Sequence, residues 1–302
     1  MICGQLPIPL FAADPKPPVA VLLSDDESVY HGPMKAFLAE IGHPAHVFNL
    51  QGDIRKDPAL KHKLFSINPR LIFALGAKAA FTAKLWTQNR QDIPVLFALV
   101  LNWQRYKLLD QKNMAGIEAE VSPGTKFAHI TMFSPKIKKI GMIYSPQSRE
   151  ILQQAKKAAE ILNIKIYDKR IYRSKDFKRS FKEVREHVDA FLVLSDPVVY
   201  TLENMDWLRT RCIKEKLPCI GKSKNIAEHG LILSITPDIA DLGSQAASVA
   251  LNIINRGQRP DLIGVMSPLG TQIIINRTTA ERIGLKLRQN SLDMATQVID
   301  RN

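Results

Sequence analysis

Short runs of apolar residues alternate with helical patterns along most of the chain. Val19 to Leu23 is a continuous apolar run that ends at Ser24, Asp25 and Asp26, as a buried parallel strand would. Similar runs predict further strands at 45–50, 71–75, 93–101, 116–120, 139–144, 164–167, 189–194, 218–220, 231–235, 262–263 and 271–276. Strands that alternate with helices in this way indicate an α/β fold with parallel sheets.

Helix start and stop signals lie between these strands. Pro33 is expected to open the first helix, because its fixed φ suits a first turn. Ser148, Thr201 and Asp238 are placed to cap later helices, and Gly257 to close the last long one.

The alternation starts again after a break at Ser134, Pro135 and Lys136. A chain of 302 residues is also long for one compact core. We therefore expect two lobes, each built on a doubly wound parallel sheet.

The composition is that of an ordinary folded protein, with 45% hydrophobic and 24% charged residues. The net charge of +13 invites a nucleic-acid interpretation, but residues 133–188 alone hold 15 Lys and Arg against 6 Asp and Glu. Those charges alternate with apolar residues at helical spacing, which favours a solvated helix face. We expect no nucleic-acid partner.

The N-terminal residues and the cysteines bear on the compartment. Leu10 and Ala12 could occupy the small-residue positions of a signal cleavage site, so residues 1–17 are interpreted as a truncated export signal, with a disordered cytosolic leader as the alternative. Cys3 could be the remnant of a lipoprotein signal, which would anchor the protein to a membrane. Cys212 and Cys219 are expected to be buried free thiols rather than a bridge.

Motifs for chemistry are absent from the sequence. It has no GxGxxG after a strand, no phosphate-binding GxxxxGK, no GxSxG and no HExxH, and its seven histidines have no metal or nucleophile spacing. We expect no catalytic residue, cofactor or metal ion, and a binding protein rather than an enzyme.

Polar residues at the ends of strands are the candidates for a ligand site, because open α/β sheets bind ligands there. Asp196 could receive a ligand ammonium, and the backbone N–H groups from Gly76 to Lys78 could receive a carboxylate. A turn or a helix cap would explain any one of these loops, but it explains less well why several polar strand ends face each other across two lobes.

Several longer segments, in their order and spacing, resemble a known family. They are LIFALGAKAA (71–80), IPVLFALV (93–100), KKIGMIYSPQS (138–148), DAFLVLSDPVV (189–199), the stretch 217–260 and IIINRTTAERIGLKL (273–287). Together they resemble the substrate-binding proteins of ABC transporters of the tryptophan/tyrosine-binding type, which have the type I periplasmic-binding-protein fold.

The resemblance implies an exported, periplasmic, monomeric receptor whose chain crosses between two lobes three times. It places 18–135 and 238–257 in the first lobe, 136–237 and 258–288 in the second, and leaves 289–302 as a polar tail expected to fray. Such a receptor closes on a small ligand and presents it to an ABC permease coupled to an ATPase. By motif position, the implied ligand contacts are Ser24, Asp25, Gly76, Ala77, Lys78, Asn102, Tyr144, Ser145, Ser195, Asp196 and Gly221.

Two departures from the family pattern widen the expected ligand class. Ala77 and Lys78 replace a small hydroxyl residue and a proline, and Asn102 lies in a turn where threonine or aspartate is common. The expected ligand is therefore an amino acid or a related small carboxylate or amine. The alternatives are a sensing domain that signals to a membrane-bound histidine kinase or cyclase, and an enzyme on the same fold.

Overall fold

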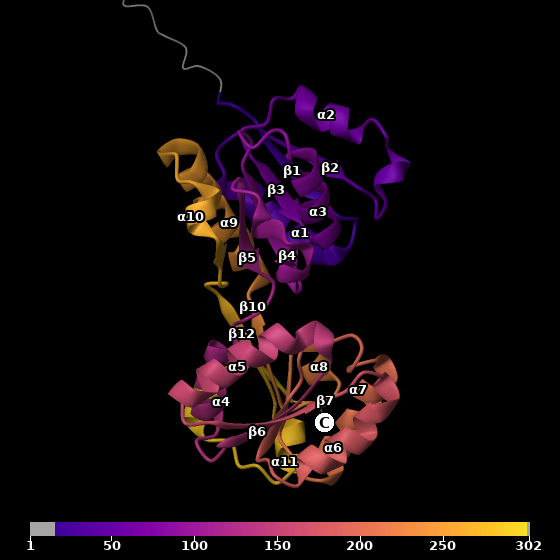
Figure 1. Ribbon diagram of the computed structural model, residues 1–302. Coiled ribbons are helices and arrows are strands. Elements are labelled where there is room, and N and C mark those ends of the chain that lie inside the picture. The colour runs from indigo at the N-terminus through magenta and orange to yellow at the C-terminus, as the bar shows by residue number, and fades with distance from the viewer. Residues whose placement is uncertain (1–15, 301–302) are drawn as a thin grey trace, which may run out of the picture.

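The chain folds into two α/β lobes, one above the other in Figure 1, and the computed structural model describes residues 16–300. The predicted fold class of two doubly wound lobes is confirmed. The predictions for the export signal and for Cys3 concern residues 1–15 and lie outside the described residues. Within residues 16–300, every helix is too short or too polar to cross a membrane.

The first lobe is built on a six-stranded sheet in which all strands are parallel. Its order is β11-β5-β4-β3-β1-β2, with β1 Val19–Leu23, β2 Ala45–Asn49, β3 Ile72–Leu75, β4 Val95–Val100, β5 Met114–Glu118 and β11 Val265–Met266. Its helices are α1 Ser28–Glu40, α2 Leu60–Ser66, α3 Ala77–Trp86, α9 Ile239–Arg256 and α10 Pro260–Ile263.

Alternate residues of the central strands feed two separate cores. Val19, Val21 and Leu23 pack with α1 and α9, whereas Ala20 and Leu22 pack with α2 and α3 on the other face. Burial on both faces explains why these strands are apolar without interruption.

Helix α1 begins earlier than its proline suggested. It starts at Ser28, and Pro33 lies inside it, where it is buried against α9. The proline removes one backbone hydrogen bond, and packing against α9 offsets that loss.

The second lobe is built on a seven-stranded sheet of order β13-β12-β10-β9-β8-β6-β7. The strands are β6 Lys139–Tyr144, β7 Lys165–Arg170, β8 Ala190–Leu192, β9 Cys219–Gly221, β10 Leu233–Pro237, β12 Thr271–Asn276 and β13 Gln297–Ile299. The helices are α4 Pro123–Phe133, α5 Arg149–Ile161, α6 Phe177–Arg185, α7 Leu202–Lys214, α8 Lys224–Glu228, α11 Arg277–Arg282 and α12 Gln289–Asp293. Strand β12 is antiparallel to β10 and parallel to β13.

Two expected boundaries between the lobes were wrong. Helix α4 was assigned to the first lobe, but its Phe127, Ile130 and Phe133 belong to the core of the second lobe, so the first crossing falls at 119–122. Residues 258–266 were assigned to the second lobe, but β11 pairs with β5 of the first sheet. The expected strand at 262–263 is instead part of α10, which precedes β11.

The polar tail was also expected to fray, and it does not. Residues 289–300 form α12 and β13, and β13 extends the second sheet beside β12. Ser291 donates a hydrogen bond to the carbonyl of Phe133 at 2.9 Å, which ties α12 to α4. Hydrogen bonding to the sheet edge therefore orders a segment with few apolar residues.

The three crossings contact one another between the lobes. The amide of Asp238 in the second crossing donates to the carbonyl of Gly270 in the third at 3.0 Å. Glu118, just before the first crossing, accepts a hydrogen bond from Ser267 at 3.3 Å. Gln245 on α9 donates to the carbonyl of Ser267 and accepts from the amide of Leu269. These hydrogen bonds join the three crossings into one hinge.

Cys212 and Cys219 form a disulfide, which corrects the expectation of free thiols. After α7 the chain turns back through Lys216, whose φ is +52°, and the amide of Leu217 donates to the carbonyl of Cys212. This turn brings the two Cα atoms to 6.1 Å, within the distance that a disulfide spans. Sequence spacing alone does not reveal that turn.

The expected helix signals and solvated charges have mixed outcomes. Thr201 and Asp238 cap α7 and α9, and Gly257 ends α9 in the left-handed conformation, as expected. Ser148 does not cap α5; its hydroxyl donates to Asp196 instead. The expected solvated face is confirmed at Lys156, Lys157, Lys175, Arg179 and Lys182, which are all exposed.

Candidate functional site

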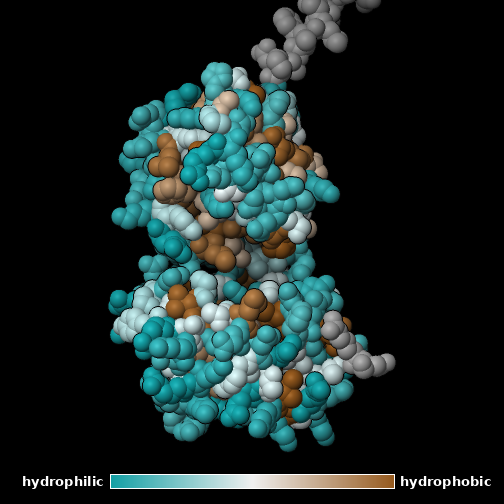
Figure 2. All heavy atoms as spheres, turned by 90° about the vertical axis from the view of Figure 1, so that its right-hand side faces the viewer, coloured by the Kyte–Doolittle hydropathy of each residue, from teal (hydrophilic) through white to brown (hydrophobic). Residues whose placement is uncertain are grey.

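A cavity of about 600 Å³ lies between the two lobes, next to the hinge. Figure 2 shows the waist of the molecule there, with hydrophobic residues on both sides of a hollow. The cavity is lined by Val29, Tyr30, Leu99, Leu101, Ala119, Glu120, Val121, Lys126, Ser195, Lys222, Ser223, Lys224, Ile235, Thr236, Pro237, Ile239 and Gln272. Both lobes and two of the crossings contribute residues to this lining.

The first lobe supplies an apolar wall. Val29 and Tyr30 come from the first turn of α1, and Leu99 and Leu101 come from the end of β4. The register between β4 and β5 shifts between Phe97 and Val100, and Leu99 has a left-handed φ of +58°. This conformation costs an L-residue about 1–2 kcal/mol, and here it accompanies a side chain that lines the cavity.

The opposite wall and the hinge supply charged and polar groups. Glu120 lies in the first crossing, and its carboxylate accepts a hydrogen bond from the hydroxyl of Ser195, which follows β8. Lys222 follows β9, and Lys126 lies on α4. The Glu120–Ser195 bond therefore connects the hinge to the end of a strand of the second lobe.

The two lysines differ from the exposed lysines of the helix faces. Lys126 as a residue is only 6% exposed. Burial lowers the pKa of Lys222, and the nearby Lys126 lowers it further, whereas Glu120 and Asp196 act in the opposite direction. Both lysines line the cavity, and each lies near enough to influence the charge of the other.

A narrow crevice adjoins the cavity along the first crossing. It holds Asn102 and Trp103 from the end of β4, together with Glu118 and Glu120. The indole nitrogen of Trp103 is buried and finds no hydrogen-bond acceptor within residues 16–300. Burial raises the pKa of Glu118, while its bond with Ser267 and its proximity to Trp103 and Lys126 act against that rise.

The protein's own groups take up part of the predicted carboxylate site after β3. The amide of Gly76 donates to the carbonyl of Ala98 at 2.9 Å, and the amide of Ala79 donates to the hydroxyl of Ser24 at 2.9 Å. A Cβ atom at Gly76 would lie 2.5 Å from the hydroxyl oxygens of Ser24 and Tyr30, so its backbone is in close contact with side chains. None of Ser24, Gly76 or Ala77 lines the cavity.

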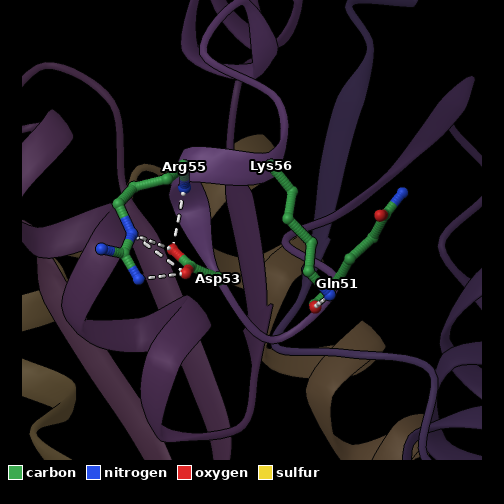
Figure 3. Close-up of polar contacts among 4 residues, drawn as sticks. All are labelled: Gln51, Asp53, Arg55 and Lys56. Carbon is green, nitrogen blue, oxygen red and sulfur yellow. Dashed lines mark hydrogen bonds and ion pairs between the residues drawn. The ribbon is translucent and has the colours of Figure 1, made fainter.

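Lys78 does not line the cavity, and its ammonium lies beside the loop that follows β2. Its ammonium lies 3.6 Å from the position of a Cβ atom at Gly52. Figure 3 shows how that loop is held. Arg55 makes an ion pair with Asp53 at 2.6 Å, and this contact lowers the pKa of Asp53 to about 2. Lys56 donates to the carbonyl of Gln51 at 2.7 Å.

Asp196 is enclosed by the protein and does not face an open cavity. It is completely buried, and its carboxylate accepts four hydrogen bonds. The donors are the amide of Ser145 at 2.7 Å, the hydroxyl of Ser148 at 2.5 Å, and the amides of Val198 and Val199 at 3.0 and 3.2 Å. Four donors use the lone-pair sites of a carboxylate. This geometry does not support the expected contact with a ligand ammonium.

The other predicted residues are distributed around the site. Ser195 lines the cavity and Asn102 lines the crevice. Asp25 accepts a hydrogen bond from the amide of Glu27. Tyr144 packs on the core of the second lobe. A Cβ atom at Gly221 would lie 2.6 Å from Ile226, so this glycine serves the packing of α8 against β9.

Sequence reasoning missed the charged residues of the cavity. Glu120 is the last residue of a predicted strand and Lys222 follows another, so the rule that found Ser195 could have found them. Lys126 carries no such signal, because a lysine on a predicted helix is normally assigned to solvent. Tyr30 was missed because α1 was expected to begin after it.

Comparison with known proteins identifies a family and several solved structures that are similar to this chain. A family model described as ABC transporter substrate binding protein matches residues 32–299. A search of curated proteins finds no match.

Solved structures share the fold at low sequence identity. The ligand-free, open structure of a substrate-binding protein with adhesive properties from Clostridium difficile is 20% identical, with a TM-score of 0.76, covering 94% of this chain and 99% of that one. A domain from Streptococcus pneumonia in complex with L-Trp is 18% identical, with a TM-score of 0.62, covering 94% and 100%. A conserved domain protein from Vibrio cholerae is 21% identical, with a TM-score of 0.62, covering 93% and 99%.

Proposed function

The chain belongs to the family of ABC transporter substrate-binding proteins, and from this premise we propose that it is an exported receptor that delivers a small ligand to a permease. The ligand class is an amino acid or a related small carboxylate or amine. The observation that carries the proposal is the cavity of about 600 Å³ between the lobes, to which both lobes contribute side chains. A volume of this size suits a small organic molecule.

Closure of the lobes is the step that binding would drive. A ligand shifts the equilibrium toward a closed form only if it binds that form better than the open one. Tyr30 in the first lobe and Lys222 in the second line the same cavity, so a ligand that contacts both would stabilise the closed form. The hinge, which joins Glu118, Ser267 and Gln245, is where the chain would bend.

We also propose that this receptor catalyses no reaction. The cavity offers an apolar wall and a cluster of Lys126, Lys222 and Glu120, which suits selection of a ligand by shape and charge. Delivery of an unchanged ligand to a permease requires no bond to be made or broken.

Ligand-induced stabilisation tests the receptor function. We expect the melting midpoint of the purified protein to rise by a few degrees with one class among amino acids, small carboxylates and small amines. A ligand at about 100 times its Kd stabilises the folded state by about 2.7 kcal/mol. The same compound should reduce the radius of gyration measured by small-angle X-ray scattering, because closure brings the lobes together.

Two outcomes would contradict the proposal. One is an unchanged midpoint across the whole panel. The other is conversion of a stabilising compound into a product, detected by mass spectrometry of the incubation mixture. The variant Ala119→Trp places a large side chain in the cavity. If this variant melts cooperatively without ligand and its melting midpoint still rises with the compound, the ligand binds elsewhere.

A further inference from the structure

The charges that line the cavity define a narrower ligand class. Resting on the receptor function proposed above, we infer that the cavity binds an organic anion: a carboxylate, without an ammonium group, on an apolar body. The carboxylate would lie between Lys126 and Lys222, and the apolar body would lie against Tyr30, Leu99 and Ile239.

Lys126 is the first observation behind this inference. Lys126 as a residue is only 6% exposed, and it lines both the cavity and the adjoining crevice. No hydrogen bond or ion pair joins its ammonium to another residue of the described range 16–300. A buried ammonium is costly unless a negative group compensates it. A ligand anion in the cavity would supply that group.

Lys222 is the second and independent observation. It comes from another segment of the second lobe, the loop after β9, and it lines the same cavity. No hydrogen bond or ion pair to its ammonium is formed within residues 16–300. Burial is the main cause that lowers the pKa of Lys222; repulsion from the nearby Lys126 lowers it further, while Glu120 and Asp196 act in the opposite direction. An anion between the two lysines would relieve this repulsion.

The acids near the cavity are already engaged. Glu120 is the acidic residue among the lining residues, and it accepts a hydrogen bond from Ser195. Asp196 accepts four hydrogen bonds and is fully buried. Glu118 lines the crevice rather than the cavity and bonds Ser267. Lys224 also lines the cavity and is paired with Glu228 at 3.9 Å. The cavity lining thus offers one acid, already bonded to Ser195, against two lysines that have no bonded partner within residues 16–300.

The remaining wall explains why the body should be apolar. Most of the surface of the cavity is apolar, and its lining includes Val29, Tyr30, Leu99, Leu101, Ile235, Pro237 and Ile239. A small, strongly hydrated dianion would leave these side chains without a partner. Each methylene group of an apolar body buried there would contribute about 0.8 kcal/mol.

The experiment compares three head groups on one body at a time. The probes are 3-phenylpropanoate, phenylalanine and phenethylamine, then 4-methylpentanoate, leucine and isopentylamine, then 3-(indol-3-yl)propanoate, tryptophan and tryptamine. Binding of each is measured by isothermal titration calorimetry on the full chain. Within at least one body we expect the acid to bind about tenfold or more tightly than the amino acid and the amine, since a hydrogen bond to a charged group contributes about that much.

Variants locate the effect in the cavity. Lys126→Met and Lys222→Met should each weaken the acid by about tenfold or more, whereas Lys126→Arg should retain most of the affinity. The matched control is Lys182→Gln, an exposed lysine on α6, which should leave the affinity unchanged. The melting midpoint of each variant without ligand separates lost binding from lost folding. Glu120→Gln removes a negative charge from the cavity lining and should tighten binding of the acid.

The outcomes separate this inference from the function on which it rests. Tighter binding of an amino acid or an amine, weakened by Glu120→Gln, would overturn the anion inference and support the receptor function. Acid binding that is unaffected by both lysine variants would also overturn the inference. If none of the nine probes nor the wider ligand panel binds, the receptor function falls, and the inference falls with it.

Discussion

Asp196 holds two loops of the second lobe together through its two carboxylate oxygens. One oxygen accepts from Ser145 and Ser148 after β6, and the other accepts from Val198 and Val199 after β8. The sequence correctly placed Asp196 at a strand end but did not show whether its oxygens face a ligand or the backbone. Both arrangements require the same residue at the same position, so only the tertiary contacts distinguish them.

Asp196→Ala should destabilise the protein by about 3 kcal/mol, because it leaves several buried donors without an acceptor. The measurement is the shift in denaturant midpoint followed by circular dichroism. Asp206→Ala is the control, since that aspartate is exposed on α7 and should change stability by less than about 0.5 kcal/mol. An unchanged midpoint accompanied by a loss of ligand affinity would instead favour a direct ligand contact.

At the scale of elements, the packing of α1 against α9 organises one face of the first lobe. The two helices approach so closely that a Cβ atom at Gly243 would lie 2.3 Å from the carbonyl oxygen of Pro33 and 2.8 Å from the Cβ of Ala36. Each helix was expected from its own periodicity. The contact was not, because a glycine inside a helix pattern does not identify the helix that it faces.

Gly243→Ala should lower stability by about 1–3 kcal/mol, since the added methyl group forces α1 and α9 apart. Gly124→Ala on α4 provides the matched control, because its added Cβ atom would lie 3.6 Å from the Cβ of Ala158, an ordinary van der Waals distance. There the higher helix propensity of alanine should raise stability by about 0.5–1 kcal/mol. The melting midpoints of both variants are measured by thermal unfolding. Equal shifts of the same sign would contradict the close contact between α1 and α9.

At the scale of the whole molecule, the lobes meet through a hinge that carries a partly buried acid. Glu118 ends β5 at the first crossing and bonds Ser267 of the third at 3.3 Å. Burial raises the pKa of Glu118 above its ordinary value. The folded state therefore holds the charged form at a cost, and this part of the stability is regained as pH falls through the raised pKa toward the unfolded value.

Glu118→Gln should raise the melting midpoint at pH 8 and have a smaller effect at pH 5, because glutamine carries no charge and still offers an oxygen to Ser267. Melting curves between these pH values provide the measurement. Glu160→Gln, an exposed residue on α5, is the control and should change neither midpoint. A loss of stability at pH 8 would show that the charge of Glu118 favours the folded hinge.

The sequence by itself determined the two-lobed α/β fold, the family and the places where ligand contacts could lie. Continuous apolar runs specify buried parallel strands, and polar residues after them mark strand ends, because both signals are local. The tertiary structure decided which lobe holds α4 and β11, because an apolar face of a helix or strand can pack on either sheet. It also decided that Cys212 meets Cys219 and that Lys126 lines the cavity, because these depend on contacts between segments whose approach no local pattern specifies.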